Sequence, residues 1–133
     1  MSENESVEGL VRAGQLDWFD TGGGNQVKVL RVSEETGAYS ALFKAAAGTT
    51  NPPHRHLGPA DFYVLSGSIE YRNGRAEAGD WIYEPTGALH EATHHPEETV
   101  YLANVYGPIA YLDADGNVAS VSDGSQMKAL LPR

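Results

Sequence analysis

The chain has 133 residues, which fits a single domain around one hydrophobic core. It contains no cysteine, which excludes disulfide bonds, thiolate metal sites, iron–sulfur clusters and cysteine nucleophiles. With 9 basic and 18 acidic residues the formal net charge is −9, and this balance argues against nucleic acids and anionic membranes as partners, because like charges repel.

The first residues of the chain and the length of its uncharged stretches indicate where in the cell the protein is expected. Residues 1–8 are acidic and polar, the opposite of a secretory signal with its basic start and apolar middle. The uncharged stretches are too short to span a bilayer. We therefore expect a soluble, cytoplasmic protein.

Glycine and proline residues divide the chain into short segments in which apolar and polar residues alternate, and this period of two predicts β-strands. In chain order, the predicted strands are Gln26–Val32, Tyr39–Ala47, Asp61–Leu65, Ser68–Tyr71, Arg75–Ala78, Trp81–Glu84, Leu89–Thr93, Thr99–Asn104, Ile109–Leu112 and Val118–Val121. Asn73-Gly74 predicts a hairpin turn before Arg75–Ala78. Short helices are expected near Val7–Arg12 and at Gln126–Leu131, the second capped by Ser125.

About ten short strands with regular turns predict an all-β sandwich or barrel, whose interior can hold a small ligand or a metal ion. His54 and His56 are two residues apart, so in a strand both imidazoles project from the same face and can meet at one ion. The same His-Arg-His tract is also compatible with a polar patch on a surface loop. His90 follows a Pro85-Thr86-Gly87 turn that would deliver it to the start of a strand.

Two segments of the chain together resemble the two motifs of the cupin family. The first extends from Gly48 through His54-Arg55-His56 to Gly67, and the second from Gly79 through Pro85-Thr86-Gly87 to His90. The resemblance implies a double-stranded β-helix, or jelly-roll, barrel in residues 16–133, after a flexible N-terminal segment of residues 1–15. It also implies that His54, His56 and His90 hold one divalent metal ion inside the barrel.

The sequence departs from the cupin motifs at two positions. Many cupins have a glutamate three or four residues after the second histidine, where this chain has Ala60 and Asp61. Asp61 either contacts the metal or, one residue out of register, faces solvent. His94 stands at the position where the second motif commonly ends in asparagine. It is either a polar residue of the pocket or a plain barrel or surface residue. His95 precedes Pro96 in an expected turn and is assigned no role.

Three neutral imidazoles would leave the charge of a divalent ion uncompensated, which favours an anionic bidentate ligand such as the enolate of a β-diketone or hydroxyketone. Further tracts are similar to the cupin subgroup that includes acetylacetone-cleaving and dihydroxyacetophenone dioxygenases. These tracts are His54-Arg55-His56-Leu57-Gly58-Pro59, Phe62-Tyr63-Val64-Leu65-Ser66-Gly67, Glu70-Tyr71-Arg72 and Ala78-Gly79-Asp80-Trp81-Ile82-Tyr83-Glu84-Pro85. The resemblance implies non-haem Fe(II), with Zn, Ni or Mn as alternatives, and a diketone-like substrate with O₂.

Members of that subgroup have a glutamate six residues before the third histidine and an arginine on the strand after the first motif. Glu84 and Arg72 stand at those spacings and are candidate catalytic residues, with a structural salt bridge between them as the alternative role. Strand alternation that turns Glu84 inward would leave Trp81 and Tyr83 outside, which predicts a homodimer interface.

Together these observations predict a metal-dependent dioxygenase that cleaves a C–C bond in a small β-diketone or hydroxyketone. Two other functions stay open. One is a metal-binding sensor or ligand-binding module without catalysis, as in the cupin domains of anti-sigma factors. The other is an isomerase or hydrolase that uses the same site with another divalent ion, since a fold alone does not fix the chemistry.

Overall fold

The computed structural model describes residues 9–72, 74–90 and 92–131, with only the backbone described for His90. The described part of the chain is built almost entirely of strands. In chain order these are β1 (Phe19–Gly22), β2 (Asn25–Val32), β3 (Tyr39–Ala45), β4 (Thr50–Asn51), β5 (His54–His56), β6 (Ala60–Ser66), β7 (Ser68–Tyr71), β8 (Gly74–Glu77), β9 (Trp81–Glu84), β10 (Leu89–His90), β11 (Thr93–His94), β12 (Thr99–Val105), β13 (Ile109–Leu112) and β14 (Val118–Ser122). A 3-10 turn at Ala13–Gln15 precedes them, and the short helix α1 (Gly124–Lys128) follows.

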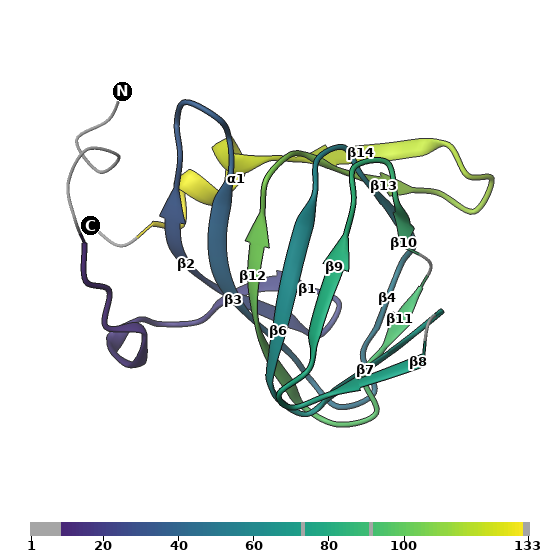
Figure 1. The fold of residues 1–133 in the computed structure, drawn as a ribbon, viewed down its shortest axis with the longest axis horizontal. Helices are drawn as coiled ribbons and strands as arrows, with labels where there is room; N and C mark the ends of the chain where they lie inside the picture. Colours follow the sequence, from purple (N-terminus) through teal and green to yellow (C-terminus); the bar gives the residue numbers. More distant parts are fainter. Residues whose placement is uncertain (1–8, 73, 91, 132–133) are drawn as a thin grey trace.

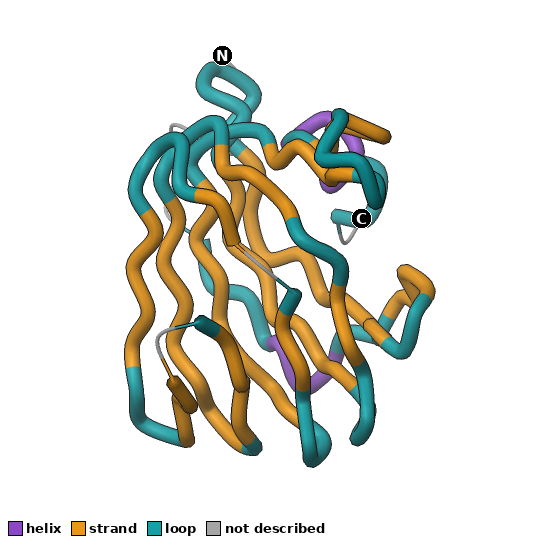
Figure 2. Tube along the Cα trace, turned by 90° about the vertical axis from the view of Figure 1, so that its right-hand side faces the viewer, coloured by secondary structure: helices purple, strands orange, loops and turns teal. Residues whose placement is uncertain are grey.

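The strands form three antiparallel sheets that enclose a common interior. A six-stranded sheet has the order β1-β2-β3-β12-β6-β9, and two four-stranded sheets have the orders β10-β5-β13-β14 and β4-β11-β7-β8. In Figure 1 the six-stranded sheet fills the centre, with β13 and β14 along the top and β4, β7, β8 and β11 on the right. Figure 2 shows the strands side by side with loops joining them at both ends. The predicted all-β jelly-roll barrel is confirmed.

Period-two alternation explains why these segments form strands and which residues they bury. In β9, Ile82 is 5% exposed and Glu84 is 7% exposed, whereas Trp81 and Tyr83 are exposed by 61% and 54%. The predicted inward and outward sets are therefore confirmed. The β7–β8 hairpin also forms as predicted, with Tyr71 paired to Gly74, although Asn73 of its turn lies outside the described residues.

Two expectations for the strands and helices need correction. The predicted strand Leu89–Thr93 is divided into β10 and β11, which join different sheets. Helix α1 begins after Asp123, not Ser125, because the Asp123 carboxylate accepts a hydrogen bond from the Ser125 backbone N–H, and the Gln126 side chain accepts one from the Asp123 backbone N–H.

The N-terminal expectations meet the structure only in part. Of the helix expected near Val7–Arg12, residues 7–8 lie outside the described residues and residues 9–12 are not helical. The flexible segment predicted for residues 1–15 likewise falls in part outside the described residues, so its boundary stays a prediction. Within the described ranges, none of the helices has the length and apolar composition that a bilayer crossing requires.

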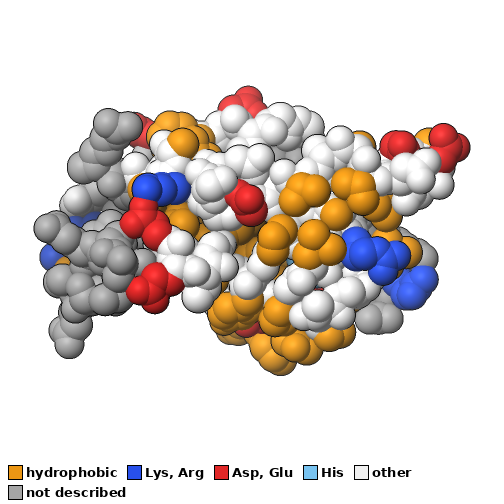
Figure 3. Space-filling view, turned by 90° about the horizontal axis from the view of Figure 1, so that it is seen from above, with side chains coloured by type: hydrophobic (Ala, Val, Ile, Leu, Met, Phe, Trp, Pro, Cys, Tyr) orange, Lys and Arg blue, Asp and Glu red, His pale blue; other side chains and the backbone are white. Residues whose placement is uncertain are grey.

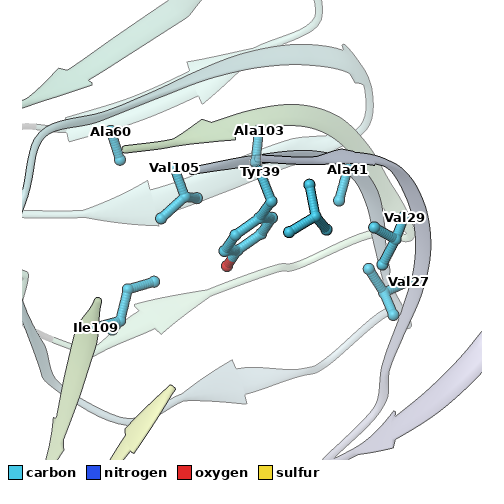
Figure 4. Close-up of a cluster of buried hydrophobic side chains, with 9 residues drawn as sticks. Val27, Val29, Tyr39, Ala41, Ala60, Ala103, Val105 and Ile109 are labelled. Carbon is cyan, nitrogen blue, oxygen red and sulfur yellow. The ribbon is translucent and has the colours of Figure 1, made fainter. Parts of the chain in front are cut away.

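The core lies between the sheets and is lined by small and β-branched side chains. The cluster in Figure 4 includes Val27, Val29, Tyr39, Val105 and Ile109. Ala41, Ala60 and Ala103, at inward positions of three neighbouring strands, are each 0% exposed. Such short side chains do not fill the interior, and a cavity of about 450 Å³ remains.

Candidate metal centre

Strand β5 places two imidazoles on the inner face of the barrel. It lies between β10 and β13, and its register pairs His54 with Tyr111 and His56 with Ile109. Since alternate residues of a strand face the same side, His54 and His56 both project inward, whereas Arg55 is exposed. The Arg55 guanidinium donates from Nη1 to the Gly87 carbonyl at 2.9 Å, which ties the outer face of β5 to the turn after β9.

The turn after β9 supports the backbone of His56. Gly87 has a φ of +82°, in the left-handed region that residues with a side chain rarely adopt. Its N–H donates to the His56 carbonyl at 2.7 Å, and the His56 N–H donates to the Ala88 carbonyl at 3.1 Å. The Pro-Thr-Gly turn therefore positions His56 as well as delivering the chain to β10.

The distances between the donor atoms suit a shared metal ion. The Nε2 atoms of His54 and His56 are 3.2 Å apart, with the two rings nearly perpendicular at 75°. Two ligand nitrogens about 2.1 Å from one ion in tetrahedral or octahedral geometry would be about 3.0 to 3.4 Å apart. Nδ1 of His54 lies 3.4 Å from the Pro52 carbonyl, an arrangement that leaves Nε2 as the nitrogen with a lone pair.

Glu84 adds a carboxylate to the two imidazoles. Its Oε2 lies 2.6 Å from Nε2 of His56, and the ligand atoms of His54, His56 and Glu84 are all within 4.8 Å of one another. Glu84 ends β9 opposite Ala60 of β6, whose methyl group leaves room for the longer side chain. Two imidazoles and one carboxylate are donors that divalent transition metals accept, so the residues fit such an ion.

This arrangement modifies the charge argument made from the sequence. Ala60 occupies the position at which many cupins have a glutamate, and it is fully buried on the inner face. Glu84 supplies a carboxylate from the neighbouring strand instead. In its ionised form this carboxylate would offset part of the charge of a divalent ion.

The other two predicted site residues are placed only in part. The backbone of His90 pairs directly with His54 in the β10–β5 ladder. The imidazole of His90, the predicted third ligand, lies outside the described part of the structure. Arg72 lies in the turn after β7 and is exposed, and its predicted catalytic role stays a prediction.

Asp61 and His94 lie away from the His54–His56–Glu84 cluster. Asp61 pairs with the outward-facing Tyr83, and its Oδ1 accepts a hydrogen bond from Asn104 Nδ2 at 3.0 Å. The one-residue shift from Ala60 thus turns Asp61 to the outer face of the sheet. Nδ1 of His94 lies 2.8 Å from the Thr50 hydroxyl on the neighbouring strand.

The cavity beside the cluster is lined mainly by aromatic and aliphatic side chains, with a few polar groups. His54, His56, Phe62, Tyr39, Tyr101 and Tyr111 all line it. Burial raises the pKa of the Tyr101 phenol well above its usual range, and Tyr111 and Glu84 nearby raise it further. Burial likewise raises the pKa of Tyr39 and Tyr111, so all three phenols stay protonated at neutral pH.

A residue that the sequence analysis left out also lines this cavity. His95 is 1% exposed, and its ring stacks on Tyr101 with centroids 6.2 Å apart and planes at 7°. The His95-Pro96 dipeptide is typical of an exposed turn, and the sequence therefore did not predict a buried position for this imidazole. Its burial depends on backbone pairing with Thr49, which continues the β4–β11 ladder between segments far apart in the sequence, and the local sequence gives no signal of that pairing.

Comparison with known proteins identifies relatives of this chain. The model of the ChrR cupin-like domain family matches residues 6–110. The acetylacetone-cleaving enzyme of Acinetobacter johnsonii is 33% identical over 102 residues, which cover 72% of this chain and 67% of the relative.

Solved structures extend the similarity to nearly the whole chain. The crystal structure of acetylacetone dioxygenase from Acinetobacter johnsonii superposes with a TM-score of 0.84 at 27% identity, covering 93% of this chain and 91% of that one. Rhodobacter sphaeroides SigE in complex with the anti-sigma ChrR gives a TM-score of 0.61 at 25% identity, covering 71% of this chain and 50% of that one. Both a dioxygenase and a regulatory protein are therefore among its structural relatives.

Proposed function

The chain belongs to the family of ChrR cupin-like domains, and from this premise we propose that it is a metal-dependent dioxygenase acting on a small β-diketone or hydroxyketone. The substrate binds as its enolate, and the C–C bond between a carbonyl carbon and the adjacent enolate carbon is cleaved, with one atom of a single O₂ added to each of these two carbons. The observation that carries the proposal is the convergence of His54, His56 and Glu84 beside a largely apolar cavity. The similarity to the acetylacetone-cleaving enzyme supports the same reaction class.

The metal ligands in this proposal are the imidazoles of His54, His56 and His90. We take Fe(II) as the ion, with Zn, Ni or Mn as alternatives, because imidazole accepts all of these metals. When bound, such an ion supplies Lewis-acid stabilisation of the enolate and a centre for O₂ chemistry.

Glu84 is proposed as the group that moves a proton. A carbon between two carbonyl groups is acidic, and a buried carboxylate close to the bound oxygens can accept its proton as the enolate forms. Its Oε2 lies 2.6 Å from His56 Nε2, so with an ion bound at that nitrogen the carboxylate would lie beside the ion and the oxygens that the ion binds. Arg72 is proposed to stabilise the anionic substrate from the strand end after β7.

The cavity wall supplies shape and excludes water. Phe62 lies between His56 and Tyr101, with ring centroids 6.1 and 6.0 Å away. The volume of about 450 Å³ accommodates a ligand of small-molecule size. An apolar wall beside a few polar groups suits a short carbonyl compound better than a sugar or a nucleotide.

Oxygen uptake tests the proposal directly. The protein is reconstituted anaerobically with Fe(II), one bound equivalent is verified, and O₂ consumption is followed with 1,3-diketones and hydroxyketones. We expect uptake with at least one compound, its loss in His56→Ala, and its retention in Glu77→Gln, a change at an exposed position on β8. Silence across the panel with metal verified as bound would remove the dioxygenase assignment.

A second candidate function is regulatory. The matched family is named for ChrR, and the complex of ChrR with SigE is among the structural relatives. In that case the metal would be structural or sensory, and the protein would bind Zn at one equivalent without turnover of any diketone. The same reconstitution experiment separates the two functions.

We also propose that the protein is a homodimer. Trp81 and Tyr83 stack with centroids 6.0 Å apart on β9, an edge of the six-stranded sheet. Tyr63 on the neighbouring strand pairs with Trp81, and it adds another aromatic ring that is 43% exposed. Figure 3 shows that hydrophobic side chains also gather on the face seen from above, so acidic side chains do not cover the whole surface. The exposed aromatic stripe on β6 and β9 would be covered by a second copy.

A further inference from the structure

His95 is held rigidly in the wall of the cavity, apart from the proposed metal ligands. Its backbone N–H donates to the Thr49 carbonyl at 2.8 Å, and its backbone carbonyl accepts from the Gly48 N–H at 2.7 Å. The parallel stacking on Tyr101 fixes the plane of the imidazole. Since the residue is 1% exposed and lines the cavity, its accessible atoms face the interior.

The hydrogen bonds of His95 define its tautomer. Nδ1 lies 3.1 Å from the Ser68 carbonyl oxygen, and because a carbonyl can only accept, Nδ1 must carry the hydrogen. Burial lowers the pKa of the imidazole, and the neighbouring His94 lowers it further, against the opposing effect of Ser68. A neutral imidazole with hydrogen on Nδ1 has a lone pair on Nε2.

Nε2 of His95 is consequently a hydrogen-bond acceptor on a side chain that lines the cavity. Within the described ranges, Ser68 is the hydrogen-bond partner of the ring, and no described group bonds to Nε2. A series of ring contacts, from His56 to Phe62 to Tyr101 to His95, places this acceptor along the same wall as the metal centre. A ligand that fills the cavity from the metal centre would therefore approach it.

We propose that Nε2 of His95 accepts a hydrogen bond from a hydroxyl group of the ligand. The cavity then favours a diketone or hydroxyketone that carries an O–H donor in addition to the oxygens bound at the metal. A ligand without this donor leaves a buried acceptor without a partner, which costs affinity. This inference rests on the proposed function in that the ligand is a carbonyl compound anchored near His54 and His56.

The test compares ligands that differ by one hydroxyl group. The probes are 1-phenylbutane-1,3-dione and its 3-hydroxyphenyl and 4-hydroxyphenyl analogues, titrated into Zn(II)-reconstituted protein so that they are not oxidised. We expect one hydroxylated analogue to bind about tenfold more tightly than the parent, as one buried hydrogen bond implies. In His95→Phe this preference should disappear, whereas His94→Gln, a change at the neighbouring histidine, should retain it.

A spectroscopic readout keeps the test independent of the folding of any variant. Long-range ¹H–¹⁵N spectra of the wild-type imidazoles should identify His95 as the neutral Nδ1–H tautomer. The hydroxylated probe should shift its Nε2 resonance, and the parent should not. His95→Gln, which keeps an acceptor at the reach of Nε2, should retain part of the preference.

The outcomes separate this inference from the proposed function. If parent and hydroxylated probes bind equally and Nε2 does not respond, the role of His95 is wrong while diketone binding stands. If none of the diketones binds, the proposed function fails, and 4-methylphenol and toluene then replace them as probes of metal-free protein. A shift of the His95 Nε2 resonance with 4-methylphenol but not with toluene would still support the acceptor role, and no shift would overturn it.

Discussion

Glu84→Gln is the substitution that best separates the metal centre from an ordinary buried ion pair. The glutamine has nearly the same volume as the glutamate, so the space opposite Ala60 stays filled, and it keeps an oxygen that can accept hydrogen bonds. What it loses is the negative charge 2.6 Å from Nε2 of His56. The perturbation is therefore electrostatic and local.

The size of the effect follows from the position of the carboxylate. An ion bound by Nε2 of His54 and His56 would lie about 2.1 Å from each nitrogen, and so within a few ångströms of Glu84 Oε2. Removing a group that contacts or orients a ligand histidine typically lowers metal affinity by about 10- to 100-fold. This corresponds to about 1.4 to 2.7 kcal/mol of binding free energy.

The assay is competition with a chromophoric chelator for Zn(II) at neutral pH, with thermal unfolding of the metal-free proteins as the measure of folding. Glu77→Gln removes the same charge from an exposed position on β8 and should leave the affinity unchanged. An affinity in Glu84→Gln equal to that of wild type would refute the reasoning, because a carboxylate beside a bound dication cannot be neutralised without effect.

Three further predictions concern the turns, the buried histidine and the outer face. Gly67→Ala should lower the free energy of unfolding by at least about 1 to 3 kcal/mol, because φ is +80° and the new Cβ would lie 2.2 Å from the Glu98 carbonyl oxygen. Gly116→Ala, at a φ of +83° but in open space, should lower it by less, as measured by chemical denaturation. Equal losses of stability in the two variants would contradict the steric reason. The lowered pKa of His95 means that the unfolded chain binds more protons below its ordinary pKa of about 6.5, so wild type should lose stability as the pH falls from 7 to 5 more steeply than His95→Gln, and parallel curves would disprove this. Trp81→Glu should convert the proposed dimer to a monomer in sedimentation velocity at micromolar concentration, whereas a wild-type protein that is already monomeric would exclude the interface.

Much of the barrel could be predicted because its signals are local. Alternation in the segment Trp81–Glu84 is enough to place Ile82 and Glu84 inside and the two aromatic rings outside. Strands of two or three residues, such as β4 and β5, are too short to display a period, so the sequence signal there is the His-Arg-His spacing alone.

The features that could not be predicted depend on long-range pairing. The shift that turns Asp61 outward is set by the register of β6 against β9 and β12, over 20 residues distant in sequence. His95 is adjacent to a proline and resembles a turn residue, but contacts with Thr49 and Ser68 bury it. The proximity of Glu84 to His56 likewise arises only when two sheets close the barrel.

The most direct test of the metal centre is anomalous diffraction from crystals of the Fe(II)- or Zn(II)-reconstituted protein. We expect one anomalous peak per chain, about 2.0 to 2.3 Å from Nε2 of both His54 and His56, with Glu84 beside it and the imidazole of His90 completing the ligands. A peak at any other place, or imidazoles at 54 and 56 that turn away from each other in the metal-loaded protein, would contradict it.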